Sequence, residues 1–353
     1  MEVVVRDRIP VDPSLGSPPS VLVRSAGSSG ALIVAAVGGD RVLQVQGGAW
    51  SVIAPPDSLL RVSNLGVLGD SLWIADDAAR RVLVLSGSSV RHREILTPTI
   101  QPHSQPHVLG LLAEGVVVVE SRPAPPVPDT LVALIAAVGT GDAMVIDSVA
   151  EFGGEMRLVP PSGSPVVLFA QPWFYRDIPV ITRNGYTLAI LRQRPARPDQ
   201  RSAIVEVHEH LRRQRRAPVQ SLSLRPTALT NAVIESWLSS VMQDSLVRFL
   251  GGRQRAEREL RAALFRPPHL PAIRRALSAS PDFLFLERVT ADTLHHWEIW
   301  QHGRRRGSFV LSPRISLQDI ADSTIWAVTR GAPGVDTILV ATVRKRSQLH
   351  SAR

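Results

Sequence analysis

Short apolar runs separated by turn residues recur along the chain. The segment GDSLWIADDAARRVLVLSG at 69–87 has an apolar run at each end and a polar middle. This pattern predicts two strands joined by a short turn. Five more segments follow the same plan, so we expect six hairpins, at 30–47, 69–87, 114–138, 185–211, 282–303 and 322–343. The pattern predicts an all-β protein.

Two of these hairpins repeat each other at an offset of 40 residues without a gap. GALIVAAVGGDRVLQVQG at 30–47 aligns with DSLWIADDAARRVLVLSG at 70–87, so that Leu32 falls on Leu72 and an Arg-Val-Leu triplet recurs. A weaker copy lies at 321–343. Self-similarity at a fixed period of this length is typical of a repeat architecture.

A four-stranded sheet that recurs every 40–50 residues or so indicates the blades of a β-propeller. Each blade packs small and branched residues against the next, because one blade alone cannot bury both of its faces. We therefore expect one six-bladed propeller domain over 1–353, with four-stranded antiparallel blades at about 1–50, 51–97, 98–150, 151–225, 266–312 and 313–346. The segment EVVVRD at 2–7 is expected to close the ring by pairing with the last blade, which removes an exposed edge.

The segment at 69–87 resembles the NHL-type repeat, whose G-x-L-W/Y-V-A-D core is followed by a return strand that contains arginine. The residues assigned to this blade motif are Trp73, Asp76, Arg80, Arg81 and Trp326. The resemblance implies that Asp76 and one of the two adjacent arginines fix the hairpin turn. The first blade departs from the motif, because Ala36 stands where the aspartate would lie. The whole chain is similar to six-bladed NHL/TolB-like propeller proteins of GC-rich bacteria.

The segment at 227–265 departs from the strand pattern. Its apolar residues recur at the spacing of one face of a helix, at Ile234, Trp237, Leu238, Val241 and Met242. Thr230 or Asn231 is placed to cap this helix, Gly251-Gly252 interrupts it, and RQRAERELRAALF at 253–265 predicts a second, charged helix. We expect a helical insertion before the fifth blade. It would either pack across a face or rim of the propeller, or cover the pore or bind a partner.

The charge pattern weakens the case for a nucleic-acid partner. The 353-residue chain has a formal net charge of +9, but Lys345 is the only lysine among its 40 basic residues. A GC-rich genome produces such an arginine bias through codon usage, so nucleic acid is disfavoured. Two dense basic runs at expected hairpin turns are candidate contacts for a polyanion, and they comprise Arg212, Arg213, Arg215, Arg216, Arg304, Arg305 and Arg306.

The absence of some residue types and segments excludes several classes of function. The chain has no cysteine, which excludes disulfides and thiol chemistry. No stretch is long and apolar enough to span a bilayer, and the N-terminal residues MEVVVRDRIP lack a signal-peptide pattern. We expect a cytoplasmic monomer, or a periplasmic protein if an export signal is missing.

The sequence predicts no catalytic residue, cofactor or metal site. G-x-S-x-G and P-loop motifs are absent from it, and His208 and His210, which alternate on one strand face, have no identifiable third ligand. The propeller resemblance adds one alternative, the calcium-dependent hydrolases similar to gluconolactonase, whose channel metal is held by Glu, Asp and Asn. The only asparagines in the chain are Asn64, Asn184 and Asn231, so few amide ligands are available for such a metal.

The favoured function is therefore a non-enzymatic binding or interaction scaffold. Its unknown partner, a protein or a small ligand, would meet the loop-lined face of the propeller near the pore. The alternative is a calcium-dependent lactonase or related hydrolase.

Overall fold

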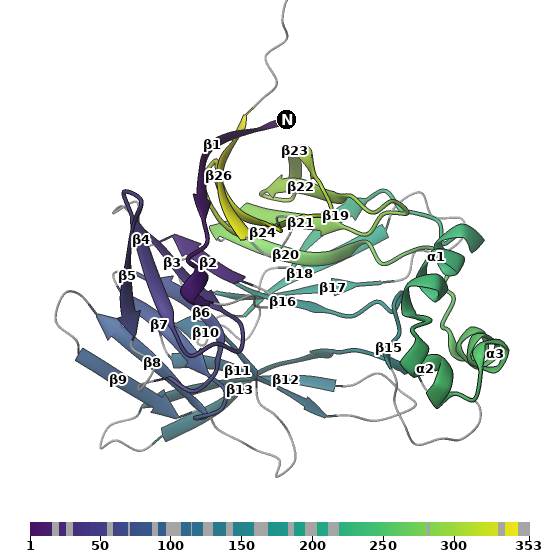
Figure 1. Ribbon diagram of the computed structural model, residues 1–353, viewed down its shortest axis with the longest axis horizontal. Coiled ribbons are helices and arrows are strands. Elements are labelled where there is room, and N and C mark those ends of the chain that lie inside the picture. Colours follow the sequence, from purple (N-terminus) through teal and green to yellow (C-terminus); the bar gives the residue numbers. More distant parts are fainter. Residues whose placement is uncertain are drawn as a thin grey trace, which may run out of the picture.

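The structure is a computed structural model of the 353-residue chain. It describes residues 1–15, 21–25, 31–54, 59–69, 71–86, 91–96, 107–113, 115–122, 130–138, 144–158, 169–182, 187–194, 203–210, 219–280, 283–330 and 336–344. Six four-stranded antiparallel sheets form the blades of a propeller (Figure 1). The predicted fold class is confirmed.

The blades follow one another in chain order. Blade 1 contains β2 (Val21–Ser25), β3 (Leu32–Ala36), β4 (Val42–Gln46) and β5 (Ala49–Ala54). Blade 2 contains β6 (Val62–Leu68), β7 (Ser71–Asp76), β8 (Arg81–Ser86) and β9 (Arg91–Leu96). Blade 3 contains β10 (His107–Leu112), β11 (Gly115–Arg122), β12 (Thr130–Val138) and β13 (Met144–Gly153).

The second half of the chain forms the other three blades. Blade 4 contains β16 (Ile178–Ile181), β17 (Leu188–Gln193), β18 (Ala203–His210) and β19 (Val219–Leu224). Blade 5 contains β20 (Ile273–Ser280), β21 (Phe283–Arg288), β22 (His295–Gln301) and β23 (Arg304–Leu311). Blade 6 contains β24 (Ile315–Ala321), β25 (Thr324–Arg330), β26 (Asp336–Arg344) and the N-terminal strand β1 (Glu2–Pro10). A short turn, η1 (Pro13–Leu15), follows β1, and a two-stranded sheet, β14 (Arg157–Leu158) with β15 (Phe169–Ala170), precedes blade 4.

The N-terminal strand closes the ring. β1 pairs antiparallel with β26, with Glu2 opposite Arg344 and Ile9 opposite Ile338. The amino group of Met1 also donates a hydrogen bond to the carbonyl of Ser308 in blade 5, at 3.0 Å. The predicted pairing of the first residues with the last blade is confirmed, and it extends as far as Pro10.

The central strands of the blades are buried on both faces. Every residue of β3 is buried, and in β7 every residue after Ser71 is buried. This is expected where one blade covers each face of the next, and it explains why these strands are continuously apolar rather than alternating. Ile33 and Ile74, from blades 1 and 2, share one such interface.

Bulges in the inner strands let neighbouring blades join. The register of β10 shifts between Val108 and Gly110, and that of β24 shifts between Leu317 and Asp319. A bulge disrupts the hydrogen-bonded ladder locally. Asn64 on β6 donates to the carbonyls of Val108 and Leu109, each at 3.2 Å.

Two arginines bond to backbone carbonyls at the bulge of β24, as Asn64 does at the bulge of β10. Arg24 on β2 donates to the carbonyl of Gln318 at 2.9 Å, and Arg275 on β20 donates to that of Leu317. Burial lowers the pKa of Arg275 from its ordinary value, and the positive charge of Arg24 adds to this effect. Side chains thus connect adjacent blades around the axis.

Three helices form the insertion between β19 and β20: α1 (Asn231–Val241), α2 (Asp244–Phe249) and α3 (Arg253–Ala263). Thr230 caps α1 by accepting from the backbone N–H of Val233 at 3.4 Å. Gly251 and Gly252 have φ angles of 82° and 112°, which suit glycine and separate α2 from α3. The short helix α2 was not predicted. None of the described helices has both the length and the hydropathy to cross a membrane.

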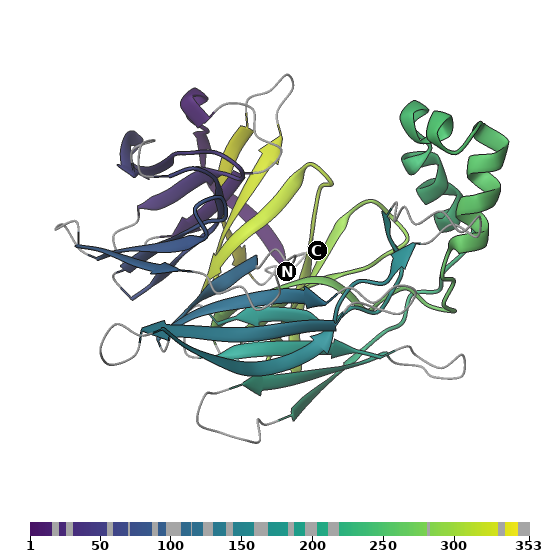
Figure 2. The same ribbon diagram turned by 90° about the horizontal axis from the view of Figure 1, so that it is seen from below.

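The helical insertion lies at the rim of the propeller. Figures 1 and 2 show α1–α3 beside β15, away from the inner strands. Their apolar side chains share a cluster with residues of the β14–β16 region and of the segment before β20; its buried members are Leu158, Trp173, Ile234, Leu238, Leu246, Leu260, Leu264 and Leu270. Of the two placements left open by the sequence, the structure has the packed insertion at the rim.

Candidate ligand-binding site

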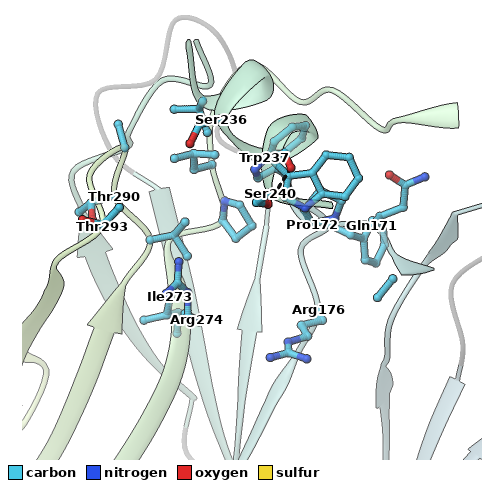
Figure 3. Close-up of a pocket in the computed structure, with 18 of the residues that line it drawn as sticks. Gln171, Pro172, Arg176, Ser236, Trp237, Ser240, Ile273, Arg274, Thr290 and Thr293 are labelled. Carbon is cyan, nitrogen blue, oxygen red and sulfur yellow. Dashed lines mark hydrogen bonds between the residues drawn. The ribbon is translucent and has the colours of Figure 1, made fainter. Parts of the chain in front are cut away.

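A cavity of about 430 Å³ lies between helix α1 and the loops of blades 4 and 5. We call it the insertion pocket (Figure 3). Its walls come from α1, from Glu155 and residues 170–176 before β16, from the start of β20 and from the β21–β22 loop. Its volume is within the range of roughly 300–1,000 Å³ typical of small-molecule sites.

One face of α1 forms the first wall. Val233, Ser236, Trp237 and Ser240 line the pocket, and they share a face because they are spaced at i, i+3, i+4 and i+7. The indole of Trp237 meets that of Trp173 edge-to-face, with ring centroids 5.8 Å apart. This contact orients the half-buried ring at the cavity wall.

Two buried amide side chains hold the other walls in place. Gln193 donates to the carbonyl of Ile273 and accepts from its N–H, at 3.0 and 2.8 Å. Gln171 donates to the carbonyl of Ala263 at 2.7 Å and accepts from the N–H of Phe265 at 2.9 Å. Both amides are thus satisfied, and they join β17 to β20 and the β15–β16 segment to the end of α3.

Tyr175 adds a third connection between these segments. Its hydroxyl donates to the carbonyl of His269 at 2.6 Å, and burial raises the pKa of Tyr175 to about 12. The phenol therefore stays protonated at neutral pH and keeps donating to this carbonyl. Side-chain hydrogen bonds from Gln171, Tyr175 and Gln193 thus connect the segments around the pocket.

Charged groups gather at the blade end of the pocket. Arg176 contacts Glu155 at 2.6 Å, and Figure 3 shows Arg176 and Arg274 at the end opposite Ser236 and Trp237. The register of β20 shifts between Ile273 and Arg275, so Arg274 is the extra residue of a bulge. Bulges commonly re-aim a side chain next to a site.

Each pocket cation and anion has a partner that holds it. Arg274 lies 3.6 Å from Glu287, a buried carboxylate that also contacts His295 at 2.7 Å. Asp292 contacts His296 at 2.8 Å. Burial opposes ionisation of Asp292, but hydrogen bonds from His296 and Thr290 outweigh it and lower its pKa from the ordinary value.

Two hydroxyl groups of the pocket act as hydrogen-bond donors. Ser240 donates to the carbonyl of Trp237 at 2.7 Å, and Thr290 donates to Asp292 at 2.9 Å. The carboxylate of Asp292 therefore holds the Thr290 hydroxyl, and the Ser240 hydroxyl is bonded to the backbone of its own helix.

A second cavity, of about 210 Å³, lies on the propeller axis and is lined by the inner strand of every blade. Asn64, one of the calcium-ligand candidates, lines this channel together with Arg24 and Asp319. Asn184 lies outside the described residues, and Asn231 begins α1. In the part of the chain that the structure describes, no three His, Asp or Glu side chains are grouped as metal ligands would be.

The blade-motif residues lie in the second and last blades. Asp76, only 1% exposed, accepts from the backbone N–H groups of Leu60, Arg61 and Ala79 at 2.9, 3.0 and 3.2 Å. Arg81 reaches the same carboxylate at 3.7 Å. The aspartate thereby ties its own hairpin turn to the loop before β6.

The other members of the motif occupy turn and core positions. Arg80 has a φ of 53° at the end of the hairpin turn. Trp73 and Trp326 are buried strand residues, 7% and 8% exposed. An ideal Cβ on Gly66 would lie 2.5 Å from the ring of Trp73, so that position has room only for glycine.

The arginines at 304–306 occupy the start of β23 instead of a turn. The β22–β23 turn consists of His302 and Gly303, with φ angles of 48° and 70°. The arginines are exposed on the outermost strand of blade 5, where charge also deters edge-to-edge pairing of sheets. Arg212, Arg213, Arg215 and Arg216 lie outside the described residues, and so do the side chains of His208 and His210.

Comparison with known proteins assigns no family to the chain. No family model and no curated protein matches it. Among solved structures, it is similar to a gluconolactonase from Xanthomonas campestris, with 9% identity, 96% of this chain and 98% of that chain covered, and a TM-score of 0.42. It is also similar to the SapL1 lectin in complex with alpha methyl fucoside, with 13% identity, 90% and 91% covered, and a TM-score of 0.42.

A third similar structure is a Bacteroides fragilis protein described as exported, with 8% identity, 97% and 96% covered, and a TM-score of 0.44. At such identities the likeness concerns the fold and transfers no activity.

Sequence reasoning found α1 but missed the insertion pocket. The helical spacing placed Trp237 on an apolar stripe, for which the sequence suggested packing on the propeller, a cover over the pore or a partner, but no small-molecule pocket. The partners of that stripe come from segments remote in the sequence, such as 170–176 and 289–293. The alternation of apolar and polar residues predicts strands, so it could not indicate these mostly loop segments as pocket walls.

Proposed function

We propose that this protein is a non-enzymatic binding module whose small-molecule ligand occupies the insertion pocket. The observation that carries the proposal is a cavity of about 430 Å³ with an aromatic wall at one end and fixed charged groups at the other. Concave sites with apolar walls and a few convergent polar groups are the usual form of ligand sites. The resemblance to NHL/TolB-like propellers agrees with this role, because in such scaffolds the loops determine binding.

The channel gives less support to the calcium-dependent hydrolase. Arg24 and Asp319 both line it, so their opposite charges offset each other. Among the described residues, no three His, Asp or Glu side chains are grouped as metal ligands would be. A thermal scan with EDTA and then with millimolar calcium tests the alternative, because a native-state ligand raises the melting temperature. The scaffold proposal expects no change, whereas a clear rise with calcium would put the hydrolase first.

The proposal is tested by blocking the pocket from the helix. Ser236 is exposed on α1 and lines the cavity, so Ser236→Trp should fill the space without disturbing the core. Ser239→Trp is the matched control, because Ser239 is exposed on the same helix and is not among the residues that line the cavity.

A fragment library would be screened by thermal shift and by tryptophan fluorescence, since Trp173 and Trp237 line the pocket. A ligand at a hundred times its Kd stabilises by about 2.7 kcal/mol, or about 3–4 °C for a chain of this size. Fragments that stabilise the parent and the Ser239→Trp variant should fail with Ser236→Trp. Equal stabilisation of all three proteins, or no stabilising fragment, would overturn the proposal.

The partner and compartment remain predictions. The expected monomer should give a single species in sedimentation equilibrium. Cell fractionation distinguishes the expected cytoplasmic location from the periplasmic alternative.

A further inference from the structure

The charged side chains of the insertion pocket are paired within the protein. Arg176 contacts Glu155 at 2.6 Å, Arg274 lies 3.6 Å from Glu287, and Asp292 contacts His296. The four charged residues that line the cavity, Glu155, Arg176, Arg274 and Asp292, have formal charges that cancel. A simple ion therefore meets little net attraction there, because the opposite charges of the lining residues offset one another.

These pairs nevertheless present donors and acceptors in fixed positions. Glu155 and Arg176 are each about half exposed, at 46% and 47%, so the pair can bond to a ligand while its members hold each other. A carboxylate only accepts and a guanidinium only donates, whereas a hydroxyl group does both. Adjacent hydroxyls of one ligand could therefore bridge such a pair.

The apolar side chains of the cavity suit the C–H face of a ring. Trp237 and Val233 line the cavity from α1, and Ile273 and Val289 line it from blade 5. Figure 3 shows Trp237 at the end away from Arg176 and Arg274. The hydroxyl groups of Ser236 and Thr293 are also among the lining groups. This combination of apolar wall and dense, neutral polar groups matches a polyhydroxylated ring better than a flat apolar molecule.

We infer that the ligand of the insertion pocket is a neutral saccharide. The inference rests on the proposed binding function and adds the chemical class to it. Recognition comes from hydrogen bonds to the ion pairs and from contact with Trp237, and net charge contributes little.

The class is tested with a panel of neutral mono- and disaccharides, together with uronic acids and sugar phosphates as charged counterparts. Binding to the full-length protein is measured by calorimetry in low salt and in about 0.5 M NaCl, where interactions between exposed charges are largely screened. The expected result is at least one neutral saccharide that binds with an affinity changed by less than about two-fold by salt. Binding should be lost in Ser236→Trp and kept in Ser239→Trp.

A second variant tests the role of the ion pair without filling the cavity. Glu155→Gln keeps the size of an exposed side chain but replaces one acceptor oxygen by a donor. It should weaken saccharide binding about ten-fold, since a hydrogen bond to a charged acceptor is stronger than one to a neutral amide. Unchanged affinity in this variant would overturn the assigned role of the pair.

Other outcomes separate the inference from the proposal beneath it. Binding only of the acidic sugars, with an affinity that falls steeply with salt, would overturn the neutral class while the pocket stands. The neutral-saccharide inference would also be overturned if no sugar of the panel binds while fragments still bind to the parent and fail to bind to Ser236→Trp. If the Ser236→Trp substitution abolishes the binding of no fragment, the proposed function itself fails.

Discussion

Asp76 offers the sharpest test of how a blade is held together. Its carboxylate is 1% exposed and accepts from the N–H groups of Leu60, Arg61 and Ala79. Arg81 lies 3.7 Å away. Asp76→Ala removes the acceptor for all three N–H groups at once, together with the carboxylate that lies 3.7 Å from the guanidinium of Arg81.

The expected loss of stability is about 3 kcal/mol. A hydrogen bond to a charged group contributes roughly 1.5–3 kcal/mol, but Leu60 and Arg61 are exposed residues, so water can partly replace the lost acceptor. Unfolding entropy of about 2.1 cal/mol/K per residue gives about 0.7 kcal/mol/K for this chain. The melting temperature should therefore fall by about 4 °C.

The assay is a calorimetric or fluorescence melt of the parent and two variants. Asp40→Ala is the matched control, because Asp40 is 57% exposed in the corresponding turn of blade 1 and reaches Arg41 only at 3.8 Å. It should cost less than about 0.5 kcal/mol. Equal melting temperatures for Asp76→Ala and Asp40→Ala would refute the idea that the buried aspartate fixes the turn.

Three further predictions concern packing, pH and surface charge. Gly66→Ala should destabilise by about 1–3 kcal/mol because its Cβ would lie 2.5 Å from Trp73, while Gly153→Ala, with 3.6 Å of room, should melt near the parent. Burial raises the pKa of Tyr175 to about 12, so its contribution to stability is present below pH 10 or so and is lost as the pH rises toward 12; absorbance titration should show this late phase, and Tyr175→Phe should remove it. Replacing the arginines at 304–306 by glutamine should lower the salt needed for elution from heparin; unchanged elution would exclude them as a polyanion contact.

Most of the fold was predictable because its signals are local. Alternation of apolar runs and turns depends on neighbouring residues, so the six hairpins and the first turn of α1 at Thr230 were readable without tertiary information. The arginines at 304–306 show the limit of this reasoning. A run of charge predicted a turn, whereas the two-residue turn at His302 and Gly303 places them in an edge strand.

The sequence alone determined the type of fold, the number of blades, the closure of the ring by the N-terminal strand and the presence of a helical insertion. Only the tertiary structure decided where that insertion packs, how Arg274 is turned by a bulge, and which residues form a pocket with Trp237. The physical reason is the range of the interactions. Strand and helix patterns arise between residues close in the chain. A pocket forms where loops from separate blades meet, and the residues of those loops follow no periodic pattern that the sequence would reveal.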